Sequence, residues 1–235
     1  MTISTSISRL TAYHARNGFR ATVRRTGVAA KRALFANRMV LFYCDLSKPD
    51  LSSMPLPSFL KVERKKIAAE LSAEDLKTMT NFWNPKLARR NIAERFEKGA
   101  SLWLIRCDGN LAGYGWTLRG STIEPHYFPL AQDDVHFFDF HVFPQYRGRG
   151  MNPFLVNQIL RELVAEGPGR AFIEAAEWNQ AQLSSLTRTP FRPLGFASKL
   201  TVFGRTLVLL TADTAFRSGG SYITQDRATQ KHAHV

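Results

Sequence analysis

One acidic and one basic side chain interrupt the apolar run from Phe137 to Phe143. The acid is Asp139 and the base is His141, and either side chain can accept a proton from a reacting group. Because residues two apart on a strand point to the same face, the spacing predicts that both lie on one face. The pair is therefore a candidate general base. The alternative is structural, with Asp139 as a buried hydrogen-bonded acid and His141 as a core histidine.

Further candidates lie on either side of this run. Glu174 and Glu177 fall in a second strand-like segment and are alternative bases, although either side chain can instead face solvent. His126 and Tyr127 precede the apolar run in a loop that contains prolines. They are candidates either to line the pocket for a second substrate or simply to cover it.

A glycine-containing turn follows the apolar run directly. It reads Gln145-Tyr146-Arg147-Gly148-Arg149-Gly150, and apolar residues then recur at helical spacing up to Leu163. A strand, a glycine turn and a helix direct several backbone N–H groups to one point at the helix N-terminus, which favours binding of a phosphate or pyrophosphate. The dinucleotide-binding and P-loop patterns are both absent from the turn.

Strands and helices are expected on both sides of this unit. A hairpin is predicted across Asp108-Gly109-Asn110. A helix is predicted after Asn84-Pro85, ending near Gly99. The other predicted strands are 39–45, 137–143, 170–177, 200–203 and 206–210. The other predicted helices start near residues 72, 151 and 179. Residues 190–196 are predicted to form a turn.

Two motifs on these elements resemble those of the GNAT superfamily of N-acetyltransferases. Gln145, Gly148 and Gly150 match the pattern [QR]-x-x-G-x-[GA], which holds the pyrophosphate of acetyl-CoA in that family. Asn179, followed by Leu194-Gly195-Phe196, resembles a second family motif. The resemblance covers roughly residues 39–212. It implies an α/β (α+β layered) fold in which helices flank a mixed, mostly antiparallel central sheet.

The resemblance also implies a function, namely acetyl transfer from acetyl-CoA to an amine by direct attack, without a metal. The backbone from Tyr146 to Gly150 would hold the pyrophosphate, and Gln145, Arg147, Arg149 and Asn179 would assist. A backbone N–H near Val142 would polarise the thioester carbonyl. Asp139, His141 and Glu174 remain the candidate catalytic residues. Phe191 departs from the family pattern, since many members have there a tyrosine that protonates the leaving thiolate.

The positive charge of the chain is concentrated at its start. The formal net charge is +13, yet no Asp or Glu occurs from Met1 to Cys44. Residues 1–38 are therefore predicted to be a basic, amphipathic helical extension, 39–212 the acyltransferase domain and 213–235 a disordered tail. The extension is expected to pack on the domain, to adsorb to an anionic membrane, or to act as an organellar transit peptide.

Several classes of partner and function remain open at this stage. The expected partners are acetyl-CoA and an amine acceptor, which includes an amino sugar or a precursor of a cell-surface polysaccharide. With two cysteines and no long apolar run, we expect a cytoplasmic protein, with the inner face of the membrane as a peripheral contact. The alternatives are a non-catalytic acyl-CoA sensor and a nucleic-acid-binding protein, the latter disfavoured because no recognition motif accompanies the charge.

Overall fold

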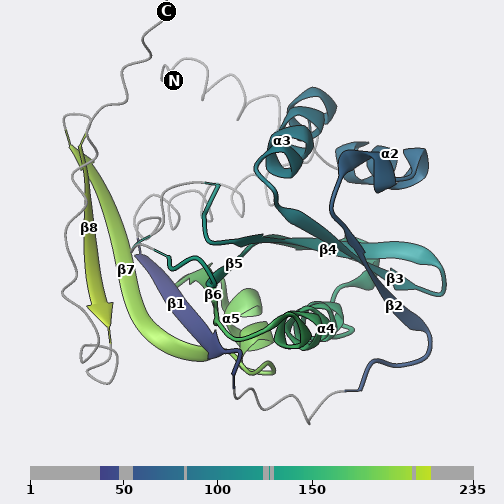
Figure 1. The fold of residues 1–235 in the computed structure, drawn as a ribbon. Helices are drawn as coiled ribbons and strands as arrows, with labels where there is room; N and C mark the ends of the chain where they lie inside the picture. The colour runs from purple at the N-terminus through teal and green to yellow at the C-terminus, as the bar shows by residue number, and fades with distance from the viewer. Residues whose placement is uncertain are drawn as a thin grey trace, which may run out of the picture.

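A single sheet forms the centre of the molecule (Figure 1). The computed structural model describes residues 38–47, 55–81, 84–123, 127, 130–202 and 205–212. Within these residues the strand order is β2-β3-β4-β5-β6-β1-β7-β8, and only the β5–β6 pair is parallel. The strands are β1 (Arg38–Asp45), β2 (Leu60–Lys65), β3 (Ser101–Cys107), β4 (Asn110–Arg119), β5 (Val135–Val142), β6 (Arg170–Ala176), β7 (Arg192–Val202) and β8 (Arg205–Ala212).

Helices cover both faces of the sheet (Figure 1). Helices α2 (Ala73–Asn81) and α3 (Pro85–Glu97) lie on one face, and α4 (Met151–Glu166) and α5 (Gln180–Leu186) lie on the other. Two 3₁₀ turns, η1 (Ala68–Glu70) and η2 (Pro144–Tyr146), complete the described helical elements. This arrangement confirms the predicted layered fold with a mostly antiparallel sheet.

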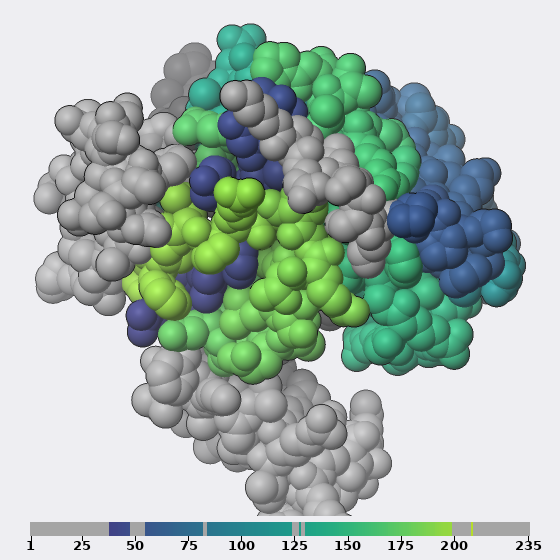
Figure 2. All heavy atoms as spheres, turned by 90° about the horizontal axis from the view of Figure 1, so that it is seen from below, coloured from purple at the N-terminus to yellow at the C-terminus, as the bar shows by residue number. Residues whose placement is uncertain are grey.

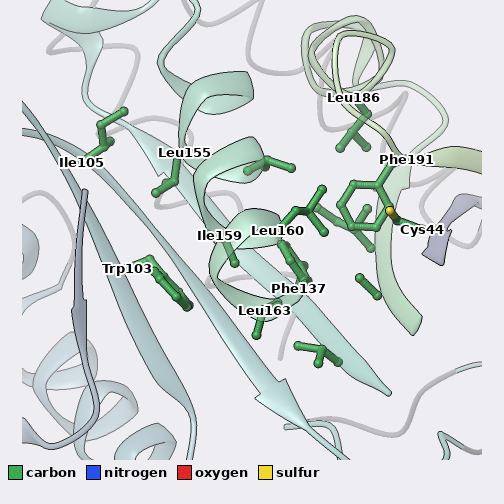
Figure 3. Packing of buried hydrophobic residues seen from close by; sticks show 14 of the residues in the cluster. Cys44, Trp103, Ile105, Phe137, Leu155, Ile159, Leu160, Leu163, Leu186 and Phe191 are labelled. Carbon is green, nitrogen blue, oxygen red and sulfur yellow. The ribbon is translucent and has the colours of Figure 1, made fainter. Parts of the chain in front are cut away.

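Alternation along the strands separates two apolar cores. On β3, Leu102 and Leu104 pack toward α2 and α3, whereas Trp103 and Ile105 pack toward α4. Figure 3 shows the second of these cores, in which side chains of α4 face Trp103 and Phe137 of the sheet. Because buried apolar area is the main favourable term in folding, this two-sided burial fixes the register of the central strands.

The predicted capping and turn residues act as expected. The side chain of Asn84 accepts a hydrogen bond from the Leu87 N–H at 3.2 Å, and Pro85 opens α3. Asp108 and Gly109 both have positive φ, as the two-residue turn between β3 and β4 requires. The hairpin and the start of α3 are thus confirmed.

The structure differs from the sequence prediction at two strands, β2 and β7. Strand β2 was not predicted, because its alternating charged residues resemble a polar loop. Strand β1, predicted over 39–45, is confirmed, and it pairs with β6 on one side and β7 on the other. Figure 2 shows its purple atoms among the yellow-green atoms of the C-terminal strands. Most of the predicted turn 190–196 belongs to β7, where pairing with β1 overrides the local Pro and Gly signals.

The predicted N-terminal extension, apart from Arg38, and the predicted C-terminal tail lie outside the described residues. Among the helices that the structure describes, none is both long and apolar enough to cross a membrane.

Candidate active site

A β-bulge in β5 positions the two candidate bases. Trp116 of β4 pairs with Phe138 and Tyr114 with His141, so Asp139 and Phe140 together face the single residue Gly115. Asp139 has φ 50°, a left-handed conformation that is uncommon for a residue with a side chain. Such bulges re-aim side chains and are frequent next to active sites.

Only a glycine fits opposite the bulge, because a side chain at this position would clash. A Cβ at Gly115 would lie 2.4 Å from the ring of Phe140. That ring stacks on Phe137 on the α4 side of the sheet, with centroids 5.9 Å apart. In the sequence, Gly113 and Gly115 within the second strand of the hairpin predict either a bulge or a close approach to the backbone, and Gly115 has both.

The bulge places Asp139 and His141 on the α3 side of the sheet. Asp139 pairs with Arg95 of α3 at 2.5 Å, and the ring of His141 lies 5.6 Å from that of Tyr114. The two residues share a face, as predicted, but strand alternation alone does not explain which face it is. Strict alternation would have placed them with Phe137, on the opposite face.

Strands β5 and β6 separate next to these residues. Their parallel pairing ends at Phe137 and Ile173, although β5 continues to Val142. The Phe143 N–H donates to the Ala112 carbonyl at 3.0 Å, so Val142 falls in the next, non-hydrogen-bonded position of the ladder. The N–H and C=O of Val142 therefore point away from β4, toward the gap beside β6.

The glycine turn continues from the end of β5 into α4. Gly148 and Gly150 have φ values of 78° and 76°, which glycine adopts without strain. Gly150 is the N-cap of α4, and no side chain caps this end of the helix. The first N–H groups of α4 therefore remain available for an anionic ligand, and the helix dipole favours one there.

A cavity of about 780 Å³ joins the gap to this turn. Six of the predicted cofactor-binding residues line it: Val142, Tyr146, Arg147, Gly148, Gly150 and Asn179. The Arg147 Nε donates to the Val142 carbonyl at 3.0 Å, and Asn179 caps α5 by accepting from the Gln182 N–H. Gln145 and Arg149 are exposed and do not line the cavity.

Sequence reasoning missed part of the cavity wall. Trp178 lies between β6 and α5, Ser184 lies on α5 and Arg188 follows it, and Asn152 lies in the first turn of α4. The Asn152 amide donates to the Ser185 hydroxyl at 2.8 Å, which ties α4 to α5. The one feature of the sequence that could have indicated Arg188 is its position: it is a basic residue at the end of the helix that follows Asn179.

A second, smaller pocket of about 370 Å³ lies beside α3. It is lined by Met79, Asn84, Leu87, Ala88, Asn91, Ile92, Arg95, Tyr114 and Asp139. The large cavity is lined by Phe140, His141 and Val142, which directly follow Asp139 on β5. One short segment of β5 therefore borders both spaces.

Glu174, the third predicted base, lies away from the large cavity and from the smaller pocket. The Glu174 carboxylate contacts the Nε2 of His136 at 2.9 and 3.1 Å, and neither side chain lines either space. Glu177 pairs with Arg38 at 3.5 Å. His136, which sequence reasoning passed over, belongs to this second acid–imidazole pair.

The environment of His141 favours its neutral form. Burial lowers its pKa below the ordinary value of 6.5, the charge of Arg147 lowers it further, and the charge of Asp139 acts in the opposite direction. At neutral pH the imidazole is therefore uncharged and able to accept a proton.

The residue that replaces the usual tyrosine lies in the core. Phe191 is buried and makes an edge-to-face contact with Phe137, with centroids 5.3 Å apart. Two tyrosines lie closer to the candidate site: Tyr146 lines the large cavity and Tyr114 the smaller pocket.

The described residues contain no cluster of three or more His, Cys, Asp or Glu side chains that could hold a metal ion. The two cysteines, Cys44 and Cys107, are buried and free.

A family model described as "Acetyltransferase (GNAT) family" matches residues 68–186. The chain belongs to this family, whose members use acetyl-CoA, and its fold implies an acyl-CoA and an acceptor substrate. The matched range runs from η1 through α5 and so includes the bulge, the glycine turn and most of the cavity wall.

The solved structures that match this chain include two that are described as GNAT acetyltransferases. A putative GNAT acetyltransferase from Novosphingobium aromaticivorans is 17% identical with a TM-score of 0.44, covering 68% of this chain and 62% of its own. A GNAT acetyltransferase from Colwellia psychrerythraea is 10% identical with a TM-score of 0.49, covering 67% of this chain and 53% of its own. The matches thus span less than two thirds of the length of those two chains. None of the curated proteins matches the sequence.

Proposed function

We propose that this protein is an acyl-CoA-dependent N-acyltransferase that transfers an acetyl group from acetyl-CoA to a primary amine. The observation that carries the proposal is the cavity in which the end of β5, the glycine turn and the uncapped start of α4 meet. The turn and the helix N-terminus suit the pyrophosphate, and Arg147 and Arg188 add positive charge beside it. The gap between β5 and β6 suits the pantetheine arm.

The proposed reaction is a direct transfer. The amine nitrogen forms a bond to the acyl carbon, the C–S bond breaks, and CoA leaves as a thiolate. The Val142 N–H, which points toward the gap, would donate to the carbonyl oxygen as negative charge develops on it. Tyr146 is the proposed acid for the thiolate, because it lines the same cavity.

His141 is the base that this arrangement favours for the proton of the amine. It borders the cofactor cavity, and its lowered pKa keeps the imidazole uncharged at neutral pH. Asp139 borders the smaller pocket, where its carboxylate can hold the incoming ammonium. Glu174 is less favoured, because His136 engages it and it lines neither space.

The test is release of free CoA thiol from acetyl-CoA by the full-length protein over a panel of primary amines. We expect amine-dependent thiol release together with a matching N-acetylated product in the mass spectrum. Tight acetyl-CoA binding without product for any amine would contradict the proposal.

A second candidate function is a sensor that binds acyl-CoA without turnover. The buried Phe191 favours it, because phenylalanine cannot donate a proton where many family members have a tyrosine. The variant Tyr146→Phe separates the two functions. In an enzyme it slows thiol release while acetyl-CoA affinity is kept, whereas a sensor has no turnover to lose.

A further part of the proposal concerns the start of the chain. The basic residues before Cys44 would attract an anionic membrane, and the acceptor would then be met at its surface. An amino sugar or a polysaccharide precursor is one class of amine made in such a place.

A further inference from the structure

The smaller pocket combines apolar walls with a single charged end. Met79, Leu87, Ala88 and Ile92 supply apolar surface from α2 and α3. Leu87 is 49% exposed, which is high for a large apolar side chain. The ionised groups among the lining residues are Arg95 and Asp139, which lie on adjoining elements. Such a lining suits a ligand with an apolar body and one polar end.

The charged end is held in place by packing. Arg95 lies over the rings of Trp116 and Phe138, 5.2 and 5.5 Å from their centroids. From there it donates to the Oδ2 of Asp139. The other carboxylate oxygen, Oδ1, accepts a hydrogen bond from no described residue, and the Asp139 side chain is 39% exposed. Arg95 thus orients this carboxylate and leaves one oxygen for a ligand.

We infer that this pocket binds the amine acceptor, and that the acceptor is a compact primary amine with an apolar body. This inference rests on the proposed function. The ammonium group contacts Oδ1 of Asp139, and the apolar body lies against Leu87, Ala88 and Ile92. Since the same segment of β5 also borders the cofactor cavity, an amine held at Asp139 is next to His141 and the gap beside Val142.

Size and polarity argue against the other acceptor classes. A volume of about 370 Å³ is near the lower end for ligand pockets and excludes a folded protein segment. An amino sugar would bring several hydroxyl groups against Met79, Leu87 and Ile92, and each buried hydroxyl without a partner is costly. Besides Arg95 and Asp139, the described polar side chains of the lining are Asn84, Asn91 and Tyr114, which are fewer than the hydroxyl groups and ring oxygen of a hexosamine would need. The amide oxygen of Asn84 is already used to cap α3. A polyamine carries several cations, whereas Asp139 is the only carboxylate among the described lining residues.

Direct binding tests the inference independently of turnover. Isothermal titration calorimetry on the full-length protein, with and without CoA, compares 2-phenylethylamine, glucosamine and spermidine at neutral pH. We expect 2-phenylethylamine to bind at least about tenfold more tightly than the other two, a difference that is readily measured. Equal or tighter binding of glucosamine or spermidine would overturn the inference.

Two pairs of variants locate the site. Ala88→Phe fills the pocket, and Ala93→Phe makes the same change at an exposed position of α3 that does not line it. Asp139→Asn removes the charge at a left-handed position, and Asp108→Asn does so at the other described non-glycine residue with positive φ. Asparagine tolerates this conformation, so both variants are expected to fold.

The expected result is a loss of at least about tenfold in 2-phenylethylamine affinity for Ala88→Phe and Asp139→Asn, with no change for the controls. Circular dichroism verifies that each variant is folded. Unchanged affinity in both pocket variants would refute the assignment. If the amine binds at this pocket but no amine releases CoA thiol, the pocket inference stands and the proposed enzymatic function fails.

Discussion

His141 is a residue whose role can be read from a pH profile. Its neighbours are Tyr114, Phe143, Asp139 and Arg147. Because its pKa lies below 6.5, the imidazole stays neutral at pH 7 and becomes protonated only as the pH falls further. A protonated imidazole cannot act as a base. We therefore expect kcat/KM of the wild-type protein to fall on the acid side with a pKa below 6.5.

His141→Asn should remove this acid limb and lower kcat by about 10²–10⁴-fold, the usual contribution of a general base, while acetyl-CoA affinity changes little. Glu174→Gln is the matching control, because it alters the other predicted base and keeps a hydrogen-bond acceptor for His136. An acid limb that persists in His141→Asn and disappears in Glu174→Gln would assign the base to Glu174.

The same shift has a consequence for folding. A histidine whose folded pKa is below its unfolded pKa binds fewer protons when folded, so stability increases with pH up to the unfolded value near 6.5. His141 therefore lowers the free energy of unfolding progressively as the pH falls below about 6.5. In His141→Asn, the free energy of unfolding should lack this part of its dependence on acid pH.

Gly148 tests the proposed role of the glycine turn in binding the pyrophosphate. Its φ of 78° is left-handed, yet a Cβ would meet nothing within 4 Å. Gly148→Ala should therefore act through backbone strain, about 1–2 kcal/mol, and not through a clash. If the free turn relaxes to another conformation, binding must restore the native one, and we expect acetyl-CoA to bind about tenfold more weakly.

Gly99→Ala is a close control for this change. Gly99 has φ 80°, a Cβ there also meets nothing within 4 Å, and it lies past the end of α3, away from the cofactor cavity. Gly99→Ala should lose stability in urea and keep its affinity for acetyl-CoA. Gly148→Ala should lose less stability, because its free turn relaxes, and it should lose affinity in calorimetry. Unchanged affinity together with this smaller loss of stability would mean that the turn does not hold the cofactor.

At the scale of elements, local signals predicted most of the elements that border the candidate site and little of the strand order. The apolar run, the glycine turn and the Asn179 cap are encoded by neighbouring residues, so β5, α4 and α5 were all predicted. The glycines of β4 predicted a bulge or a close approach, but not that the extra residue lies in β5, since this depends on how Phe140 fits against Gly115 of another strand. The smaller pocket was also missed, because α3 and β5 meet only in the tertiary structure.

The position of β1 could not have been predicted from local signals either. The same apolar pattern suits a strand at the edge of a sheet and a strand in its centre. Which of the two positions the strand takes depends on pairing with residues far away in the sequence. Here Leu41 and Phe42 of β1 are buried from opposite faces of the sheet, between β6 and β7. The first described strand thus joins the two C-terminal ones to the rest of the sheet.

This central position predicts a large stability cost for a core change in β1. Phe42 is 5% exposed and packs in the core that α4 covers. Phe42→Ala should lower the free energy of unfolding by about 3–5 kcal/mol, as is typical of a buried phenylalanine. Phe59→Ala, at a residue that is 50% exposed, should cost much less. Similar urea midpoints for the two variants would contradict the central placement of β1.

At the scale of the whole molecule, charge is distributed unevenly along the chain. Residues 1–37 carry seven basic residues and no acidic ones, and the whole chain has 32 basic and 19 acidic residues. The segment therefore supplies more than half of the net charge of +13. An anionic lipid surface attracts such a segment with about 1 kcal/mol per basic residue near it.

Neutralising three of these residues should weaken membrane binding strongly. The triple variant Arg20→Gln, Arg24→Gln, Arg25→Gln should bind vesicles that contain phosphatidylserine about a hundredfold more weakly, because about 3 kcal/mol of attraction is lost. The control removes the same charge from exposed positions of α3, with Lys86→Gln, Arg89→Gln and Arg90→Gln. Vesicle flotation at low and high salt measures both. If the two variants lose binding equally, net charge alone attracts the protein to the lipid, and the start of the chain has no special role in meeting the acceptor there.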